Sequence, residues 1–163
     1  MNKLELIGIG QDVYYEELEN GLKIYILPFD NKNNYFISYF TKFGSLILDF
    51  EKDKKMIHVP EGIAHFLEHK MFEQEDGIDP FAFFAQSGTG CNASTSYKAT
   101  RYYCMGNEKV YENLDYLISY VNSPYFTDEN VEKEKGIICE EINMLKDNPE
   151  WFAEEEMQRM LYH

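Results

Sequence analysis

Two of the four histidines in this 163-residue chain lie within one short segment, GIAHFLEHKMFEQ, at residues 62–74. His65 and His69 are four residues apart, and Glu68 lies between them. In a helix, residues i and i+4 share a side, so the two imidazoles would converge on one point. Imidazoles and carboxylates are ligands that zinc prefers in proteins. The spacing therefore indicates a metal site, with a pair of histidines on a solvated helix face as the alternative.

The order of these three residues indicates what the metal would do. H-x-x-E-H is the inverse of the H-E-x-x-H motif of zinc peptidases, and both orders supply two ligands and a general base from adjacent turns of one helix. The segment also contains apolar residues, which are Ile63, Ala64, Phe66, Leu67, Met71 and Phe72. They predict a largely buried helix, in which polar side chains need partners. A metal bound by these side chains would meet that need.

A third ligand can be sought in the long helix predicted over residues 127–147. Its apolar residues recur at helical spacing, and they are Val131, Ile138, Ile142 and Leu145. At about 100° per residue, Glu134 and Glu141 lie roughly 60–80° from the centre of this apolar stripe, whereas Glu140 lies on the opposite side. Glu134 and Glu141 are therefore candidates for one metal ligand and one supporting carboxylate. The alternative is that both are ordinary residues at the rim of an amphipathic helix.

The sequence also predicts the elements that must position these side chains. Two alternating runs joined at Asn20-Gly21 predict a β-hairpin. The other predicted elements are strands at 34–44 and 45–50, a charged loop at 51–60, helices at 61–73 and 79–88, strands at 90–97 and 100–106, and helices at 108–121, 127–147 and from 149 onward. This order predicts an α+β fold, in which helices pack on one face of a mainly antiparallel sheet.

The composition argues against several kinds of partner and location. A net charge of −14 predicts that the chain binds neither nucleic acid nor an anionic membrane surface, because both attract Lys and Arg. No apolar stretch approaches the length of a membrane span. The three cysteines, Cys91, Cys104 and Cys139, are odd in number and widely spaced, so we expect thiols rather than disulfides. The first residues do not form a signal peptide, and we expect a cytoplasmic protein.

Two segments together resemble the pitrilysin, or insulinase, family of zinc metallopeptidases, which includes insulin-degrading enzyme and the mitochondrial processing peptidase. They are GIAHFLEHKMFE at residues 62–73 and VEKEKGIICEEINMLKDNPEW at residues 131–151. The likeness is greatest to the bacterial processing-protease-like members, and it covers nearly the whole chain. The resemblance implies a zinc-dependent endopeptidase that hydrolyses peptides or unfolded segments.

The resemblance also assigns roles to individual residues. The implied Zn²⁺ ligands are His65, His69 and Glu141. Glu68 would be the general base, and Glu134 would occupy the second catalytic position, seven residues before the third ligand. The segment SGTGCNASTSYKATRYY, at residues 87–103, resembles a substrate-binding strand edge of the family, so Asn92 and Ala93 would bind the peptide as an added strand. Without the resemblance, this segment would be an ordinary hairpin with small residues.

Full members of the family pair such a domain with a second, similar one. We therefore expect residues 1–163 to form one N-terminal metal-binding domain, truncated from a longer protein. The missing C-terminal half, or a second homologous subunit, would complete the substrate chamber. One alternative is a non-catalytic relative that serves as a binding subunit, against which the intact motif residues argue. Another is a metal enzyme resembling the S-ribosylhomocysteine lyases, which use a cysteine ligand where this chain offers Glu141.

Overall fold

The computed structural model describes residues 1–5, 10–30 and 32–162. Backbone contacts divide the chain into two compact units, Met1–Asn33 and Asn34–His163. The expectation of a single domain truncated from a longer protein stays a prediction. Among the residues described, no helix combines the length and the apolar character that crossing a membrane requires.

The first unit is a three-stranded antiparallel sheet with the order β1-β2-β3. Its strands are β1 (Asn2–Glu5), β2 (Asp12–Glu17) and β3 (Lys23–Ile26). Gly21 lies in the turn between β2 and β3 with a φ of 83°, a conformation that glycine adopts without strain. The predicted hairpin at Asn20-Gly21 is therefore confirmed. Strand β1 was not predicted, because four residues are too few to reveal an alternating pattern.

The second unit contains a three-stranded antiparallel sheet with the order β4-β8-β7. Its strands are β4 (Tyr35–Thr41), β7 (Gly90–Thr95) and β8 (Thr100–Gly106). Successive side chains of a strand point to opposite faces. In β8, Tyr102 and Cys104 are accordingly buried on one face, whereas Met105 is exposed on the other. The sheet therefore has one face that belongs to the core.

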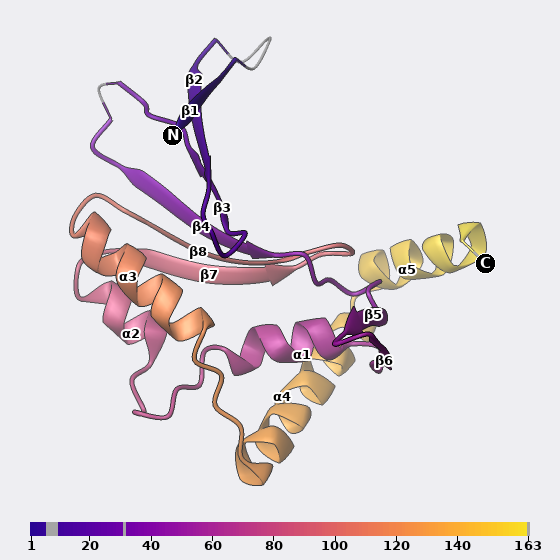
Figure 1. Ribbon diagram of the computed structural model, residues 1–163. Coiled ribbons are helices and arrows are strands. Elements are labelled where there is room, and N and C mark those ends of the chain that lie inside the picture. The colour runs from indigo at the N-terminus through magenta and orange to yellow at the C-terminus, as the bar shows by residue number, and fades with distance from the viewer. Residues whose placement is uncertain (6–9, 31, 163) are drawn as a thin grey trace. The chain divides into compact units, whose positions relative to one another are not determined.

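Three helices cover this buried face of the sheet (Figure 1). They are α1 (Ile63–Lys70), α2 (Pro80–Ala85) and α3 (Val110–Val121). The core between the helices and the sheet is rich in aromatic side chains, and its buried members are Met71, Phe84, Tyr102, Cys104, Leu117 and Tyr120. The predicted α+β fold, with helices packed on one face of antiparallel strands, is confirmed, although the strands form three separate sheets.

Two further helices, α4 (Asp128–Lys146) and α5 (Pro149–Leu161), complete the second unit. Helix α4 begins with a capping box, because the Thr127 side chain accepts from the Asn130 backbone N–H (3.1 Å) and the Asn130 side chain accepts from the Thr127 backbone N–H (2.9 Å). This cap fixes where α4 starts and so fixes the position of each side chain along it. Helix α4 packs against α1, so these two helices meet although they are far apart in the sequence.

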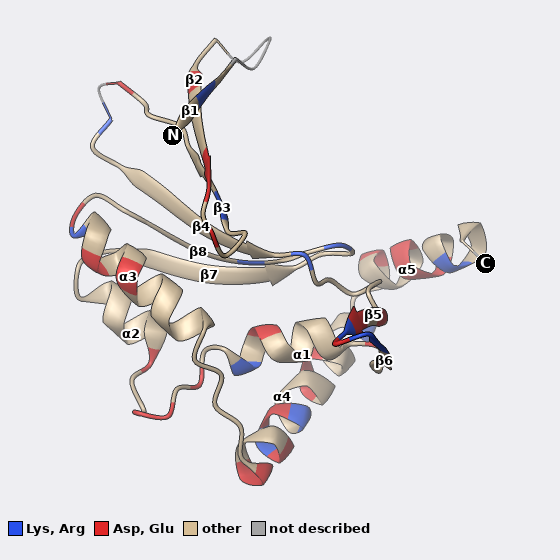
Figure 2. Cartoon of the chain, viewed as in Figure 1, with Lys and Arg blue, Asp and Glu red and all other residues tan. Residues whose placement is uncertain are grey.

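The prediction of a charged loop at residues 51–60 is wrong. Strands β5 (Asp49–Lys52) and β6 (Lys55–His58) form an antiparallel hairpin there. Its two turn residues, Asp53 and Lys54, have φ angles of 53° and 61°, as a two-residue hairpin turn requires. Lysine rarely adopts this conformation, and the many charged residues of the hairpin, coloured in Figure 2, mask the alternation by which a strand is recognised. The predicted strand at 45–50 is correspondingly reduced to its last two residues.

We expect the free energy of unfolding to fall as the pH rises from about 9 to 12. Burial raises the pKa of Cys91 to about 11 and of Cys104 to about 12, whereas a cysteine in an unfolded chain ionises at about 8.5. In this range the folded protein holds protons that the unfolded chain has lost, so rising pH favours unfolding. Urea unfolding at about pH 7.5, 9, 10 and 10.5 measures the effect. Substitution of both residues by Ala should flatten the decline, and substitution of the exposed Cys139 should not. A free energy that stays constant up to pH 10.5 would contradict the expectation.

Candidate metal centre

Helix α1 lies between strand β7 and helix α4 and carries both histidines of the motif (Figure 1). The helix begins after Gly62, whose φ of 81° suits glycine and turns the chain into the first helical turn. Ala64 and Glu68 are buried, so the helix is embedded as its apolar residues predicted. His65 and His69 are half-buried and lie on the side that faces α4.

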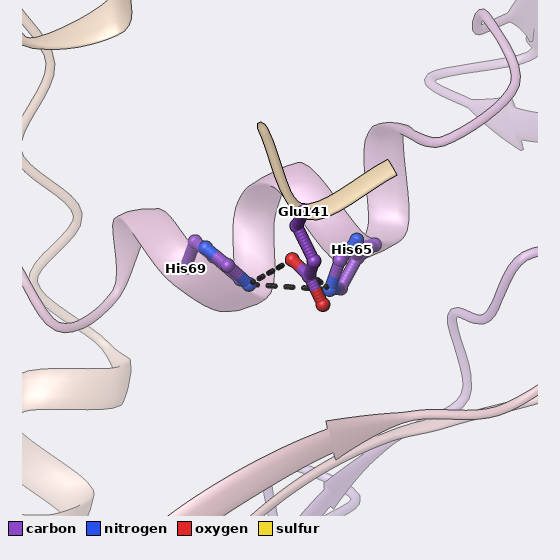
Figure 3. Close-up of side chains that lie close together, drawn as sticks. All are labelled: His65, His69 and Glu141. Carbon is purple, nitrogen blue, oxygen red and sulfur yellow. Dashed lines mark hydrogen bonds and ion pairs between the residues drawn. The ribbon is translucent and has the colours of Figure 1, made fainter. Parts of the chain in front are cut away.

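Three donor atoms from these two helices converge on one point (Figure 3). The Nε2 atoms of His65 and His69 are 3.1 Å apart. The Oε2 atom of Glu141 lies 3.7 Å from the first and 3.6 Å from the second. Ligand atoms placed tetrahedrally around zinc, at the usual metal–ligand distances, are about 3.3 Å from one another. The three residues therefore fit one zinc ion in spacing and in chemical type.

Glu134 supports this arrangement from behind His69. Its Oε1 atom lies 2.9 Å from Nδ1 of His69, and its side chain is buried with only 7% of the residue exposed. A carboxylate accepts the Nδ1–H proton, which leaves the lone pair of Nε2 free to face the other two donors. The buried carboxylate in turn has the partner that it needs. Glu134 thus orients His69 without belonging to the three converging donors.

The face that α4 turns toward α1 differs from the predicted apolar stripe. Its least exposed positions are Asn130, Val131, Glu134, Ile138, Glu141 and Leu145. Glu134 and Glu141 therefore lie near the middle of the inward face, not at its rim, because each has a histidine partner on α1. Ile142, which was placed in the stripe, is 42% exposed. The prediction that both glutamates point inward is confirmed. The predicted apolar stripe, however, was centred too far around the helix, toward the exposed Ile142.

Glu68 is not one of the three donors, and its side chain contacts strand β7. The residue is 8% exposed, and its Oε2 atom accepts a hydrogen bond of 2.6 Å from the Thr95 hydroxyl. The sequence analysis did not select Thr95. The sequence does contain one indication of its position. Thr95 lies two residues after Ala93, and the side chains of residues i and i+2 in a strand point to the same face. The contact itself joins segments that are distant in sequence, so no local pattern reveals it.

Asn92 and Ala93 lie on β7, which is an edge strand of its sheet. Within the described part of the chain, no strand pairs with the outer edge of β7. The Ala93 backbone N–H donates to the Asn92 side chain at 2.8 Å, so this amide is satisfied inside the strand itself. Neither residue is among the three converging donors. Their predicted contact with a substrate stays a prediction.

Comparison with known proteins places this geometry in a family. The sequence profile of Insulinase (Peptidase family M16) matches residues 58–163, which is more than half of the chain. The chain belongs to the insulinase family. The same sequence is 45% identical over 150 residues to the zinc protease YmfH of Bacillus subtilis, an alignment that covers 91% of this chain and 35% of YmfH.

Solved structures of the insulinase family share the fold. A crystal structure of an M16-like peptidase from Alicyclobacillus acidocaldarius has a TM-score of 0.90 and 39% sequence identity, covering 98% of this chain and 37% of that one. Pitrilysin has a TM-score of 0.67 at 19% identity, covering 85% of this chain and 14% of its own, which is a likeness of fold alone. The chain spans about a third of the length of YmfH and of the Alicyclobacillus protein.

We expect His69 of the metal-free chain to be a single tautomer that is protonated on Nδ1, because Glu134 accepts that proton. Long-range ¹⁵N–¹H correlation spectra of the imidazoles report the tautomer directly. Glu134→Ala should abolish this preference, and Glu134→Gln should retain it because an amide oxygen still accepts the proton. Glu132→Ala, at an exposed position of the same helix, is the matched control. Protonation of His69 on Nε2 in the wild type would contradict the assignment.

Proposed function

We propose that this chain is the zinc-binding part of an endopeptidase that hydrolyses peptides or unfolded segments. The observation that carries the proposal is the convergence of His65, His69 and Glu141 beside an H-x-x-E-H helix. Membership of the insulinase family supports it, as does the name zinc protease borne by YmfH. The donor set also favours zinc, because two imidazoles and one carboxylate leave a fourth position for a reacting molecule.

Four side chains would form and support the metal site. His65, His69 and Glu141 would hold the ion, and Glu134 would keep His69 in the tautomer that can bind it. Zinc, when bound, supplies a Lewis acid that polarises the peptide carbonyl and makes water a better nucleophile at neutral pH. The chain's own contribution is to present three donors at the right spacing before the ion arrives, which reduces the cost of ordering them.

Glu68 would move the protons of the reaction. It lies one residue before His69 in the same helix but has a separate hydrogen-bond partner on β7, so it is free of the donor set. Its carboxylate would accept a proton from the attacking water and deliver that proton to the leaving amine of the cleaved peptide. Because Glu68 is nearly buried, few water molecules surround it, and electrostatic interactions around it are strong.

The substrate would bind as an extended strand along the outer edge of β7. Such an edge offers backbone donors and acceptors that pair with a peptide of almost any sequence. Asn92 and Ala93 lie on this edge, and the small Ala93 lets a second backbone approach closely. We further propose that a second half of the protein, or a homologous subunit, encloses the peptide from the other side. The coverage of only 35% of YmfH supports that part of the proposal.

The first test measures zinc in the purified chain by mass spectrometry. We expect about one zinc per wild-type chain, and a zinc affinity at least tenfold lower for Glu141→Gln, because an amide is a poorer ligand than a carboxylate. The matched control is Glu140→Gln, since Glu140 is the exposed neighbour on the same helix. Equal zinc content in all three proteins, or none in the wild type after zinc is supplied, would contradict the proposed site.

The second test separates a peptidase from a binding subunit. Glu68→Gln should keep its zinc and lower kcat about 10²- to 10⁴-fold, because it removes the general base and leaves the three ligands in place. Hydrolysis of internally quenched fluorescent peptides measures the rate. A protein that includes the second half, and that binds zinc and peptides but hydrolyses none of them, would favour the non-catalytic alternative. A Glu68→Gln variant as active as the wild type would exclude Glu68 as the base.

A further inference from the structure

The hydrogen bond between Thr95 and Glu68 joins the motif helix to the sheet. Thr95 is the last residue of β7, and α1 lies beneath that end of the strand (Figure 1). The Thr95 hydroxyl is 2.6 Å from Oε2 of Glu68, a short distance that is typical of a hydroxyl donating to a charged carboxylate. Within residues 1–5, 10–30 and 32–162, Thr95 is the one hydrogen-bond partner of the Glu68 side chain.

We propose that Thr95 is a positioning residue, which holds the Glu68 carboxylate in the orientation that proton transfer requires. The inference rests on the proposed function. A glutamate side chain has three rotatable bonds, and a helix backbone alone does not fix its carboxylate. The bond from Thr95 fixes Oε2 against β7 and leaves Oε1 for the proton. It also engages one carboxylate oxygen at β7, and Glu68 is not among the three converging donors.

The surroundings of Thr95 make it a rigid anchor. Thr95 pairs with Thr100 at the start of a short turn, which Ser96 closes by a backbone hydrogen bond of 2.8 Å to Ala99. The backbone of Gly44 packs so closely against this turn that a Cβ there would lie 2.4 Å from Ser96 O. Ser45 adds a backbone bond of 3.0 Å to the same oxygen. The backbone that follows Thr95 is therefore held by contacts on two sides.

The neighbouring Thr100 shows why the Thr95 proton goes to Glu68. The Thr100 hydroxyl donates to the backbone carbonyl of Phe43 at 2.8 Å. It lies 3.4 Å from the Thr95 hydroxyl, which is much longer than the 2.6 Å to Glu68. The charged and closer acceptor prevails. Thr100 therefore resembles Thr95 in residue type and location, but among the residues described its hydroxyl forms no hydrogen bond with Glu68, which makes it the matched control.

The kinetic experiment compares three variants of the zinc-loaded chain. Thr95→Val keeps the shape and removes the hydroxyl, and we expect kcat to fall about 10- to 100-fold with KM and zinc content nearly unchanged. Thr95→Ser keeps the hydroxyl and should restore most of the rate. Thr100→Val removes a buried hydroxyl of the same kind and should lower stability without lowering kcat. A Thr95→Val variant with the wild-type kcat, or a Thr95→Ser variant as slow as Thr95→Val, would overturn the proposal.

A second measurement does not depend on activity. A double-mutant cycle of Thr95→Val and Glu68→Gln, followed by urea unfolding of the metal-free chain, isolates the coupling between the two side chains. We expect the coupling to change the unfolding equilibrium constant about tenfold. Additive effects would overturn the proposal. If a protein that includes the second half hydrolyses no peptide, the proposed function fails, and the cycle still decides whether Thr95 holds Glu68.

Discussion

The second unit is organised around the contact between two imidazoles on α1 and two carboxylates on α4. Helix α4 belongs to a strongly acidic chain, and it turns Glu134 and Glu141 inward. Buried carboxylates are unfavourable without partners, so the histidines of α1 determine which side of α4 can face the core. This requirement also fixes the angular position of the apolar residues that flank the two glutamates. Helices α1 and α4 are thus held in register by paired polar groups, which would be unfavourable in an apolar environment without these partners.

The sheet β4-β8-β7 provides the fixed surface behind this contact. The aromatic face of this sheet includes Tyr102, which packs in one core with Tyr120 of α3. This core excludes water from the side of α1 that faces the sheet. Burial accordingly raises the pKa of both tyrosines, with the nearby Glu68 as a smaller cause for Tyr102. Helix α1 is therefore supported on two sides, by apolar packing and the Thr95–Glu68 bond toward the sheet and by paired polar groups toward α4. A helix fixed in this way can keep several side chains oriented at once.

The sequence predicted this site better than it predicted its surroundings, for a physical reason. The spacing of His65 and His69 and the inward side of Glu134 and Glu141 follow from helical geometry alone, which a sequence contains completely. The apolar stripe through Ile142 was misplaced because that argument assumed that only apolar residues face inward. The β5–β6 hairpin was missed because its turn uses a lysine in a conformation typical of glycine or asparagine.

Thr95 illustrates what local patterns do not contain. Its alternation with Ala93 could place it on the helix-facing side of the strand, but nothing in the sequence says that Glu68 arrives there. Contacts of this kind depend on how far α1 is displaced along β7, which is decided by packing of the whole core. The family resemblance selected one glutamate where the residues alone left two open, and that glutamate, Glu141, lies with the two histidines in the converging set.

The bond between the Asn92 side chain and the Ala93 amide has a consequence for the solubility of the chain. An uncovered strand edge with free amides is a template for unwanted pairing with other chains, and proteins commonly blunt such edges. Here one amide of β7, that of Ala93, is already satisfied by the neighbouring Asn92 side chain. A strand that pairs with Ala93 must first displace this side chain, so it exchanges one hydrogen bond for another and gains little from that bond alone. Nonspecific pairing with another chain at Ala93 is therefore disfavoured, whereas a segment that also fits the neighbouring positions of β7 can still bind reversibly.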